Sequence, residues 1–220
     1  MIPVKICGIT SRKDAEIVVN HGASAIGMIF YKKSPRFILP EKIKKWISTI
    51  PNNIKTVGVF VNEKQKNINT IVEELDLDYI QLHGDESPEY CDKMIKPVIK
   101  VFRMGAAFDP AILDIFHVHA FLFDTYQKGI RGGTGKSFNW DLISDLNSDT
   151  PIILSGGLNL ENISQVIETV RPSAIDINSG VESKQGVKDK EKVTKLFHAL
   201  ENIKYIANNY SVFGGGFGGI

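Results

Sequence analysis

The chain has 220 residues and is 43% hydrophobic, which is enough to bury a sizeable core and suits one barrel-sized domain better than two small ones. Its 26 Lys and Arg against 25 Asp and Glu give a formal charge of +1, so we expect no nucleic-acid partner. The sequence contains neither a membrane-length apolar run nor a secretory leader pattern, so we expect no membrane partner and a cytoplasmic location. Its two cysteines, Cys7 and Cys91, belong to no disulfide framework and no metal-ligand motif, so no metal is predicted.

Short runs rich in Val, Ile and Phe alternate with segments of helical periodicity along the chain. This alternation is typical of βα units and a parallel sheet. Eight evenly spaced repeats predict that the sheet closes into a single (β/α)8 barrel of the TIM type, covering residues 1–206. The predicted strands are Val4–Cys7, Ala25–Phe30, Thr56–Val61, Tyr79–His83, Val98–Phe102, Ala120–Asp124, Pro151–Ser155 and Ala174–Asn178.

Helix signals fall between these strands. Ser87 followed by Pro88 predicts a helix start, with the serine as cap and the proline in the first turn. Residues 159–170 begin with an Asn cap candidate and then carry apolar side chains at helical spacing. A closing helix is predicted from Lys188 to about Ile206.

Two glycine-rich segments have no helical or strand repeat. Residues 132–137 end in GKS like a phosphate-binding P-loop, but the first glycine of that motif would fall at Ile130, so the motif fails. A mobile loop that closes over a substrate is predicted there instead. The composition of residues 207–220 predicts a disordered tail, to which the sequence assigns no function.

The carboxyl ends of several predicted strands carry chemically capable residues, and this is where barrels of this type hold their reacting groups. Cys7 ends the first strand, His83 the fourth and Asp124 the sixth. The loops after the seventh and eighth strands contain glycines at the position where backbone N–H groups commonly bind phosphate. The phosphate-binding candidates are Gly156, Gly157, Asn178, Ser179 and Gly180.

Seven motifs, taken together and in this order, resemble those of the phosphoribosylanthranilate isomerase family. The resemblance extends over residues 1 to about 205, and the set is far more specific than any single motif. The motifs are KICGIT from Lys5, SPR from Ser34, VGVFV from Val57, QLHGD from Gln81, GTG from Gly133, LSGGL from Leu154 and DINSGVE from Asp176.

The resemblance implies an isomerase of tryptophan biosynthesis that converts N-(5-phosphoribosyl)anthranilate to 1-(2-carboxyphenylamino)-1-deoxyribulose 5-phosphate. Carried over residue by residue, it implies Cys7 as general base and Asp124 as general acid. It also implies that Arg36 contacts the anthranilate carboxylate and that Asp176 is a polar partner near the reacting carbons. His83 is left open between a substrate contact and a hydrogen bond at the rim.

The chemistry of the residues agrees with those roles. An Amadori rearrangement needs one acid to open the sugar and one base to remove a proton from C2, so neither a cofactor nor a metal is expected. A cysteine base must be at least partly thiolate. Lys5 lies two residues before Cys7 on the same strand face and is expected to lower the pKa of that thiol if it points inward.

Other functions of a phosphate-binding barrel remain open. The related aminoaldose isomerase of histidine biosynthesis has an Asp where this chain has Cys7, and indole-glycerol-phosphate synthase needs a Lys/Glu set that the sequence lacks. A non-catalytic barrel that binds sugar phosphates would need neither Cys7 nor Asp124. The sequence allows either a monomer or a homodimer.

Overall fold

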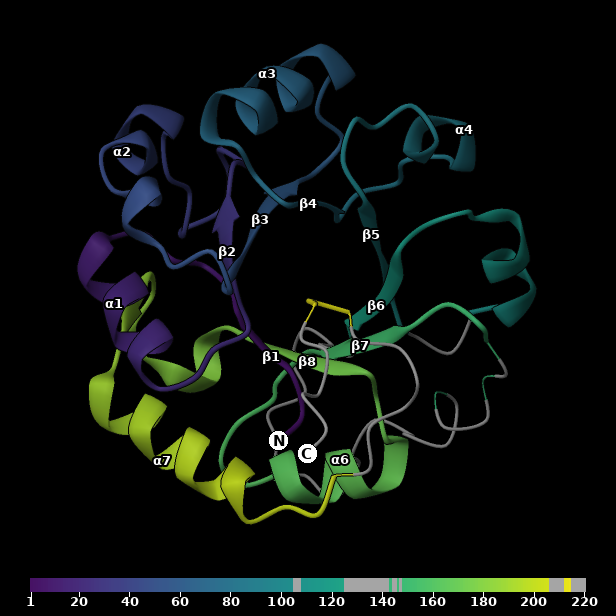
Figure 1. Ribbon diagram of the computed structural model, residues 1–220. Coiled ribbons are helices and arrows are strands. Elements are labelled where there is room, and N and C mark those ends of the chain that lie inside the picture. The colour runs from purple at the N-terminus through teal and green to yellow at the C-terminus, as the bar shows by residue number, and fades with distance from the viewer. Residues whose placement is uncertain (105–107, 125–142, 144–145, 147, 206–211, 215–220) are drawn as a thin grey trace.

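Eight parallel strands close into a barrel, as the sequence predicts (Figure 1). The structure is a computed structural model and describes residues 1–104, 108–124, 143, 146, 148–205 and 212–214. Neighbouring strands pair in chain order, and the eighth pairs with the first. Each strand lies within one residue of its predicted bounds. The strands are β1 Val4–Ile6, β2 Ala25–Ile29, β3 Lys55–Phe60, β4 Tyr79–Leu82, β5 Val98–Arg103, β6 Ala120–Asp124, β7 Ile152–Ser155 and β8 Ala174–Ile177.

Helices surround the barrel on its outer side (Figure 1). The predicted start at Ser87 and Pro88 is confirmed, because the Ser87 side chain accepts a hydrogen bond from the backbone N–H of Tyr90. The described α-helices are α1 Arg12–Asn20, α2 Pro40–Lys44, α3 Gln65–Leu75, α4 Pro88–Cys91, α6 Ile163–Val170 and α7 Lys190–Glu201, and short 3₁₀ turns lie at Ile47–Thr49, Pro110–Ile115 and Ser179–Val181.

The segment before α7 differs from the sequence-based expectation. A helix was expected from Lys188, but α7 begins two residues later, after the Asp189 cap. Lys188 instead belongs to a small antiparallel hairpin formed by β9 Glu182–Lys184 and β10 Val187–Lys188. The helix signal at Lys188 was wrong because two- and three-residue strands are too short to show a period.

Alternating side chains of the barrel strands form two apolar layers. Outward-facing residues such as Ile6, Phe121 and Phe123 belong to the large cluster between the strands and the helices. Inward-facing residues such as Ile99 and Leu122 form a separate cluster inside the barrel. The barrel interior is therefore a packed core that fixes the strand ends around it.

Part of the predicted disordered tail is buried. Val212 and Phe213 are 0% and 1% exposed and belong to the cluster inside the barrel. Phe213 packs edge-on against Tyr79 at the start of β4, with ring centroids 6.0 Å apart. Val212 accepts a hydrogen bond from His119 Nε2 at 2.8 Å. These two residues of the segment for which the sequence predicts disorder therefore fill the N-terminal end of the barrel.

No helix within the described ranges is long and apolar enough to cross a membrane.

Candidate active site

Cys7 stands at the C-terminal rim of the barrel, directly after β1. Its backbone N–H donates to the carbonyl of Ile177 at 2.9 Å, so the position is fixed by the β1–β8 pairing. The residue is only 4% exposed. Burial on a rigid strand end gives the thiol a defined orientation.

A buried ion pair lies next to the thiol, between Lys5 on β1 and Asp176 on β8. Lys5 is fully buried, and its Nζ donates to Oδ1 of Asp176 at 2.9 Å. A Cβ at Gly27 would lie 3.0 Å from Cys7 Sγ and 3.1 Å from Lys5 Nζ, so both groups occupy the space beside this glycine. Lys5 therefore points inward, beside Cys7, which is the orientation that its expected effect on the thiol requires.

The electrostatics of Cys7 are a balance of opposing effects. Burial raises the pKa of the Cys7 thiol, and the carboxylate of Asp176 raises it further. The charges of Lys5 and Lys188 lower it, but they do not overcome burial. Burial also acts to lower the pKa of Lys5, but Asp176 and Cys7 outweigh that effect and hold it above its ordinary value. Lys5 thus stays an ammonium and favours the thiolate without creating it outright.

Asp124 ends β6 at the same rim and is partly buried. The ring Nε2 of His83 lies 3.4 Å from Oδ2 of Asp124, which brings together two residues that the sequence placed on separate strands. Arg103, paired with Asp124 in the β5–β6 register, donates from Nη2 to the His83 carbonyl at 3.2 Å. Ser155 is the last residue of β7, and Asp176 lies on β8. These two strands lie between β6, which carries Asp124, and β1, which precedes Cys7.

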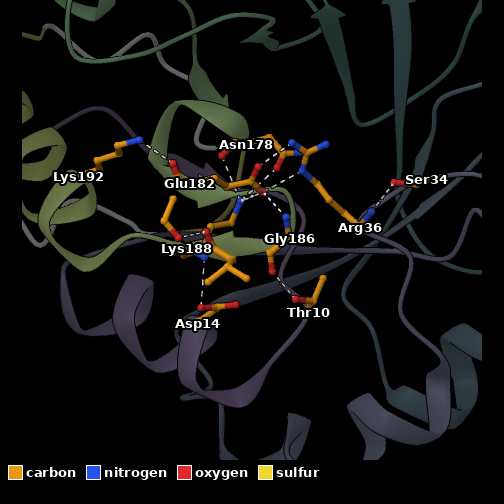
Figure 2. Close-up of polar contacts among 11 residues, drawn as sticks. Thr10, Asp14, Ser34, Arg36, Asn178, Glu182, Gly186, Lys188 and Lys192 are labelled. Carbon is orange, nitrogen blue, oxygen red and sulfur yellow. Dashed lines mark hydrogen bonds and ion pairs between the residues drawn. The ribbon is translucent and has the colours of Figure 1, made fainter.

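Arg36 lies on the loop after β2, and its guanidinium is held from one side (Figure 2). Nε donates to Oε1 of Glu182 at 2.8 Å, and Nη2 donates to Oε2 at 2.6 Å. This hydrogen-bonded partner raises the pKa of Arg36. The hydrocarbon part of Arg36 and the amide of Asn178 both press on Gly8, since a Cβ there would lie 2.7 Å from Arg36 Cδ and from Asn178 Oδ1. Arg36, Asn178 and Cys7 therefore surround one glycine.

The predicted phosphate loops lie next to each other. Gly156 and Gly157 have φ of 96° and 66°, which residues with a Cβ rarely adopt. Gly180 lies directly against the carbonyl of Leu158, so the loop after β8 packs on the loop after β7. Ser179 begins a 3₁₀ turn and is exposed. The two predicted phosphate loops therefore pack against each other.

Three residues of this end were not singled out from the sequence as site residues. Glu182 closes the DINSGVE motif but received no role, and Lys188 was assigned to a helix. Arg103 was missed because the fifth strand was expected to end one residue earlier. The alternation of Ile99, Val101 and Arg103 along β5 is the signal that identifies it. The predicted mobile loop at 132–137 lies outside the described residues.

Known proteins resemble this chain along most of its length. The family model described as N-(5'phosphoribosyl)anthranilate (PRA) isomerase matches residues 4–199. The N-(5'-phosphoribosyl)anthranilate isomerase of Syntrophus aciditrophicus is 42% identical over 207 residues, covering 94% of this chain and 90% of the relative.

Solved structures agree with that match. The phosphoribosyl anthranilate isomerase of Thermotoga maritima superposes with a TM-score of 0.82 at 36% identity, covering 92% of this chain and 100% of that one. A phosphoribosyl anthranilate isomerase in complex with reduced 1-(o-carboxyphenylamino)-1-deoxyribulose 5-phosphate superposes with a TM-score of 0.78 at 34% identity, with 92% and 100% coverage. The chain therefore belongs to the N-(5'-phosphoribosyl)anthranilate isomerase family.

Proposed function

We propose that this chain converts N-(5-phosphoribosyl)anthranilate to 1-(2-carboxyphenylamino)-1-deoxyribulose 5-phosphate, an Amadori rearrangement of tryptophan biosynthesis, with Cys7 as general base and Asp124 as general acid. One observation carries the proposal. A buried thiol and a carboxylate stand at the ends of β1 and β6, on one rim of a barrel that belongs to this isomerase family.

The two roles account for the protons moved in ring opening and in deprotonation at C2, and exchange with solvent returns a proton to Asp124 and removes one from Cys7 after each turnover. Protonated Asp124 gives its proton to the ring oxygen of the ribose as the bond between that oxygen and C1 breaks, which leaves an iminium conjugated to the aryl nitrogen. The thiolate of Cys7 then removes the proton from C2 and forms an enolamine. Tautomerisation of the enolamine moves a proton to C1 and yields the ketone, so substrate and product are isomers. The reaction consumes no oxidant or reductant, which is why neither a cofactor nor a metal is proposed.

The environment of Cys7 supports its role as the base. Its raised pKa makes the thiolate a stronger base once it forms, and the adjacent Lys5 ammonium favours that ionised form. Asp176, held by Lys5, lies beside the thiol and is proposed as a polar partner of the substrate near the reacting carbons.

The remaining rim residues supply binding. Arg36 is proposed to bind the anthranilate carboxylate, since a guanidinium matches a carboxylate in charge and in planar geometry. His83 is proposed to contact the substrate next to Asp124, within reach of its carboxylate at 3.4 Å. Backbone groups of the two adjoining loops are proposed to bind the phosphate. The residues of those loops are Gly156, Gly157, Asn178, Ser179 and Gly180.

We further propose that the enzyme works in the cytoplasm, as a monomer or a homodimer, with its sugar-phosphate substrate as partner and without nucleic acid or membrane. Both cysteines are unpaired thiols, as is usual for proteins of reducing compartments.

The decisive assay generates phosphoribosylanthranilate in situ and follows the loss of its anthranilate-type fluorescence when the purified chain is added. Reduction of the product with borodeuteride should place deuterium on C2, because only the rearranged product carries a ketone there. Well-folded protein that leaves the fluorescence unchanged would refute the proposal. Fluorescence loss without deuterium at C2 would indicate a different reaction.

A further inference from the structure

The hairpin between β8 and α7 carries a buried carboxylate whose oxygens are all engaged. The Glu182 side chain is 4% exposed. Besides Nε of Arg36, its Oε1 accepts from Lys188 Nζ at 3.0 Å and from the backbone N–H of Gly186 at 3.3 Å, while Oε2 accepts from Arg36 Nη2. Burial acts to raise the pKa of Glu182, but its two cationic partners outweigh that effect and lower it. Glu182 is therefore a carboxylate at the pH of the cell.

Every N–H of the Lys188 ammonium is engaged in a hydrogen bond. Its side chain is fully buried, and Nζ donates to Glu182 Oε1 at 3.0 Å and to both the backbone carbonyl and Oδ1 of Asn178, each at 3.1 Å. An ammonium has three donors, and all three are accounted for. Lys188 therefore joins Glu182 to the loop after β8 and acts as its counterion.

The hairpin itself is fixed from several sides (Figure 2). Thr10 Oγ1 donates to the Gly186 carbonyl at 2.5 Å, and Asp14 accepts from the backbone N–H of Lys188 at 3.3 Å. Lys192 Nζ donates to the Glu182 carbonyl at 2.7 Å. A side chain on so well anchored a hairpin can hold a flexible partner in one place.

The geometry of Arg36 shows which part of it is held. Nε and Nη2 make two parallel hydrogen bonds to Glu182, and this uses one edge of the planar fork. The edge made by Nη1 and the second proton of Nη2 is a second site for a planar carboxylate. Cδ of Arg36 lies against Gly8, the residue after Cys7, so the guanidinium is oriented next to the reacting end of the barrel.

We propose that Glu182 is a positioning residue, which holds the guanidinium of Arg36 so that its outer edge receives the carboxylate of the substrate, with Lys188 as the buried counterion that fixes Glu182. The inference rests on the proposed function. A long arginine on a loop loses much rotamer freedom when it binds a ligand, and a prebound partner removes part of that cost before the substrate arrives. Arg36, Glu182 and Lys188 together carry one positive charge, which complements a carboxylate.

The test compares two substrates in one set of variants: phosphoribosylanthranilate and N-(5-phosphoribosyl)aniline, which lacks the carboxylate. For Glu182→Gln we expect KM for the anthranilate substrate to rise by about tenfold while kcat falls less. kcat/KM for the aniline substrate should stay close to wild type. In an Arg36→Met background the same substitution should raise KM for the anthranilate substrate little further, because the guanidinium that Glu182 holds is already absent. Glu191→Gln is the matched control, because it removes an exposed carboxylate of α7 that pairs with Lys195. It should change neither KM nor kcat for either substrate.

Glu182→Gln leaves Lys188 buried without its counterion and can fold poorly. The double variant Glu182→Gln/Lys188→Met removes both charges, and the same anthranilate-specific rise in KM is expected for it. An equal rise in KM for both substrates, or no rise in KM for either variant while Arg36→Met raises KM for the anthranilate substrate, would overturn the positioning role and leave the proposed function intact. An unchanged KM in Arg36→Met would overturn the inference and the carboxylate assignment together. An inactive wild type would overturn the proposed function itself.

Discussion

The two ends of the barrel are built from the same eight strands but from opposite kinds of residue. The C-terminal end holds buried charges in partnered sets, with Lys5 on Asp176 and Lys188 on Glu182. The N-terminal end is filled by apolar groups, with Phe213 entering from the far end of the chain. Buried ion pairs contribute little net stability because desolvation offsets their attraction, whereas buried apolar area contributes directly. We therefore expect the C-terminal end to carry the proposed chemistry and the N-terminal end to contribute much of the stability.

The largest effect is expected from removing the base. Cys7→Ala should lower kcat by about 10²–10⁴-fold, because general base catalysis supplies a factor of that size. Its melting temperature should stay close to wild type. Cys91→Ala, which removes the other buried thiol from the outer core, is the matched control and should keep its activity while losing a little stability. Cys7→Ala with near-normal turnover would remove Cys7 from the mechanism.

The same division predicts the opposite outcome at the N-terminal end. Phe213→Ala should reduce the free energy of unfolding by about 3 kcal/mol, since truncating a buried Phe costs about that much. The melting temperature should fall by about 6–12 °C in a domain of this size. kcat measured well below the melting transition should not change. Calorimetry with Ile115→Ala as control, a residue that is 56% exposed, checks this. An unchanged melting temperature would mean that Phe213 does not stabilise the barrel.

A more moderate effect is expected from the charge beside the thiol. Lys5→Met removes the ammonium that lowers the pKa of Cys7 and leaves Asp176, which raises it, without its partner. Both changes have the same sign, so the pKa of Cys7 should rise. The rate of Cys7 alkylation by iodoacetamide should then increase only at higher pH than in the parent protein.

The alkylation is measured in a Cys91→Ala background, so that Cys7 is the only thiol. Lys100→Met is the matched control, because it also breaks a buried ion pair, with Glu86 at 2.8 Å, but beneath the loop after β4. Superimposable titrations of the Lys5→Met and parent proteins would show that Lys5 does not act on the thiol.

The smallest effect concerns the hydrogen bond that holds Val212. The carbonyl of Val212 can only accept, so Nε2 of His119 must carry the proton. His119→Phe keeps a ring against Tyr79 but removes this donor, and it should cost about 1 kcal/mol. Equilibrium urea unfolding measures the loss. A variant as stable as wild type would mean that water replaces the histidine.

The sequence predicts the barrel well because each strand carries its own local signal. Runs such as Ala120–Phe123 alternate between two buried faces, so strand bounds could be read to within one residue. The same strand pattern places Cys7 and Asp124 at the carboxyl ends of their strands, while their proposed roles come from the family resemblance.

The hydrogen-bonded group of Arg36, Glu182 and Lys188 could not be predicted so directly. Glu182 and Lys188 become buried only because a hairpin of five strand residues folds onto Arg36 from elsewhere in the chain. Nothing in the local pattern separates these two from solvated charges. Val212 and Phe213 pose the same difficulty, because their glycine-rich surroundings indicate disorder while the residues that bury them lie far away in sequence.

The burial of Phe213 also orders the assembly of the barrel during synthesis. Ribosomes deliver the chain from its N-terminus at about 5–20 residues per second, so all eight strands are made before residues 212 and 213 emerge. Until then the ring of Tyr79 and the first residues of the strands lack the cover of Val212 and Phe213 at the N-terminal end of the barrel. The apolar cluster inside the barrel is therefore completed only when this segment folds back.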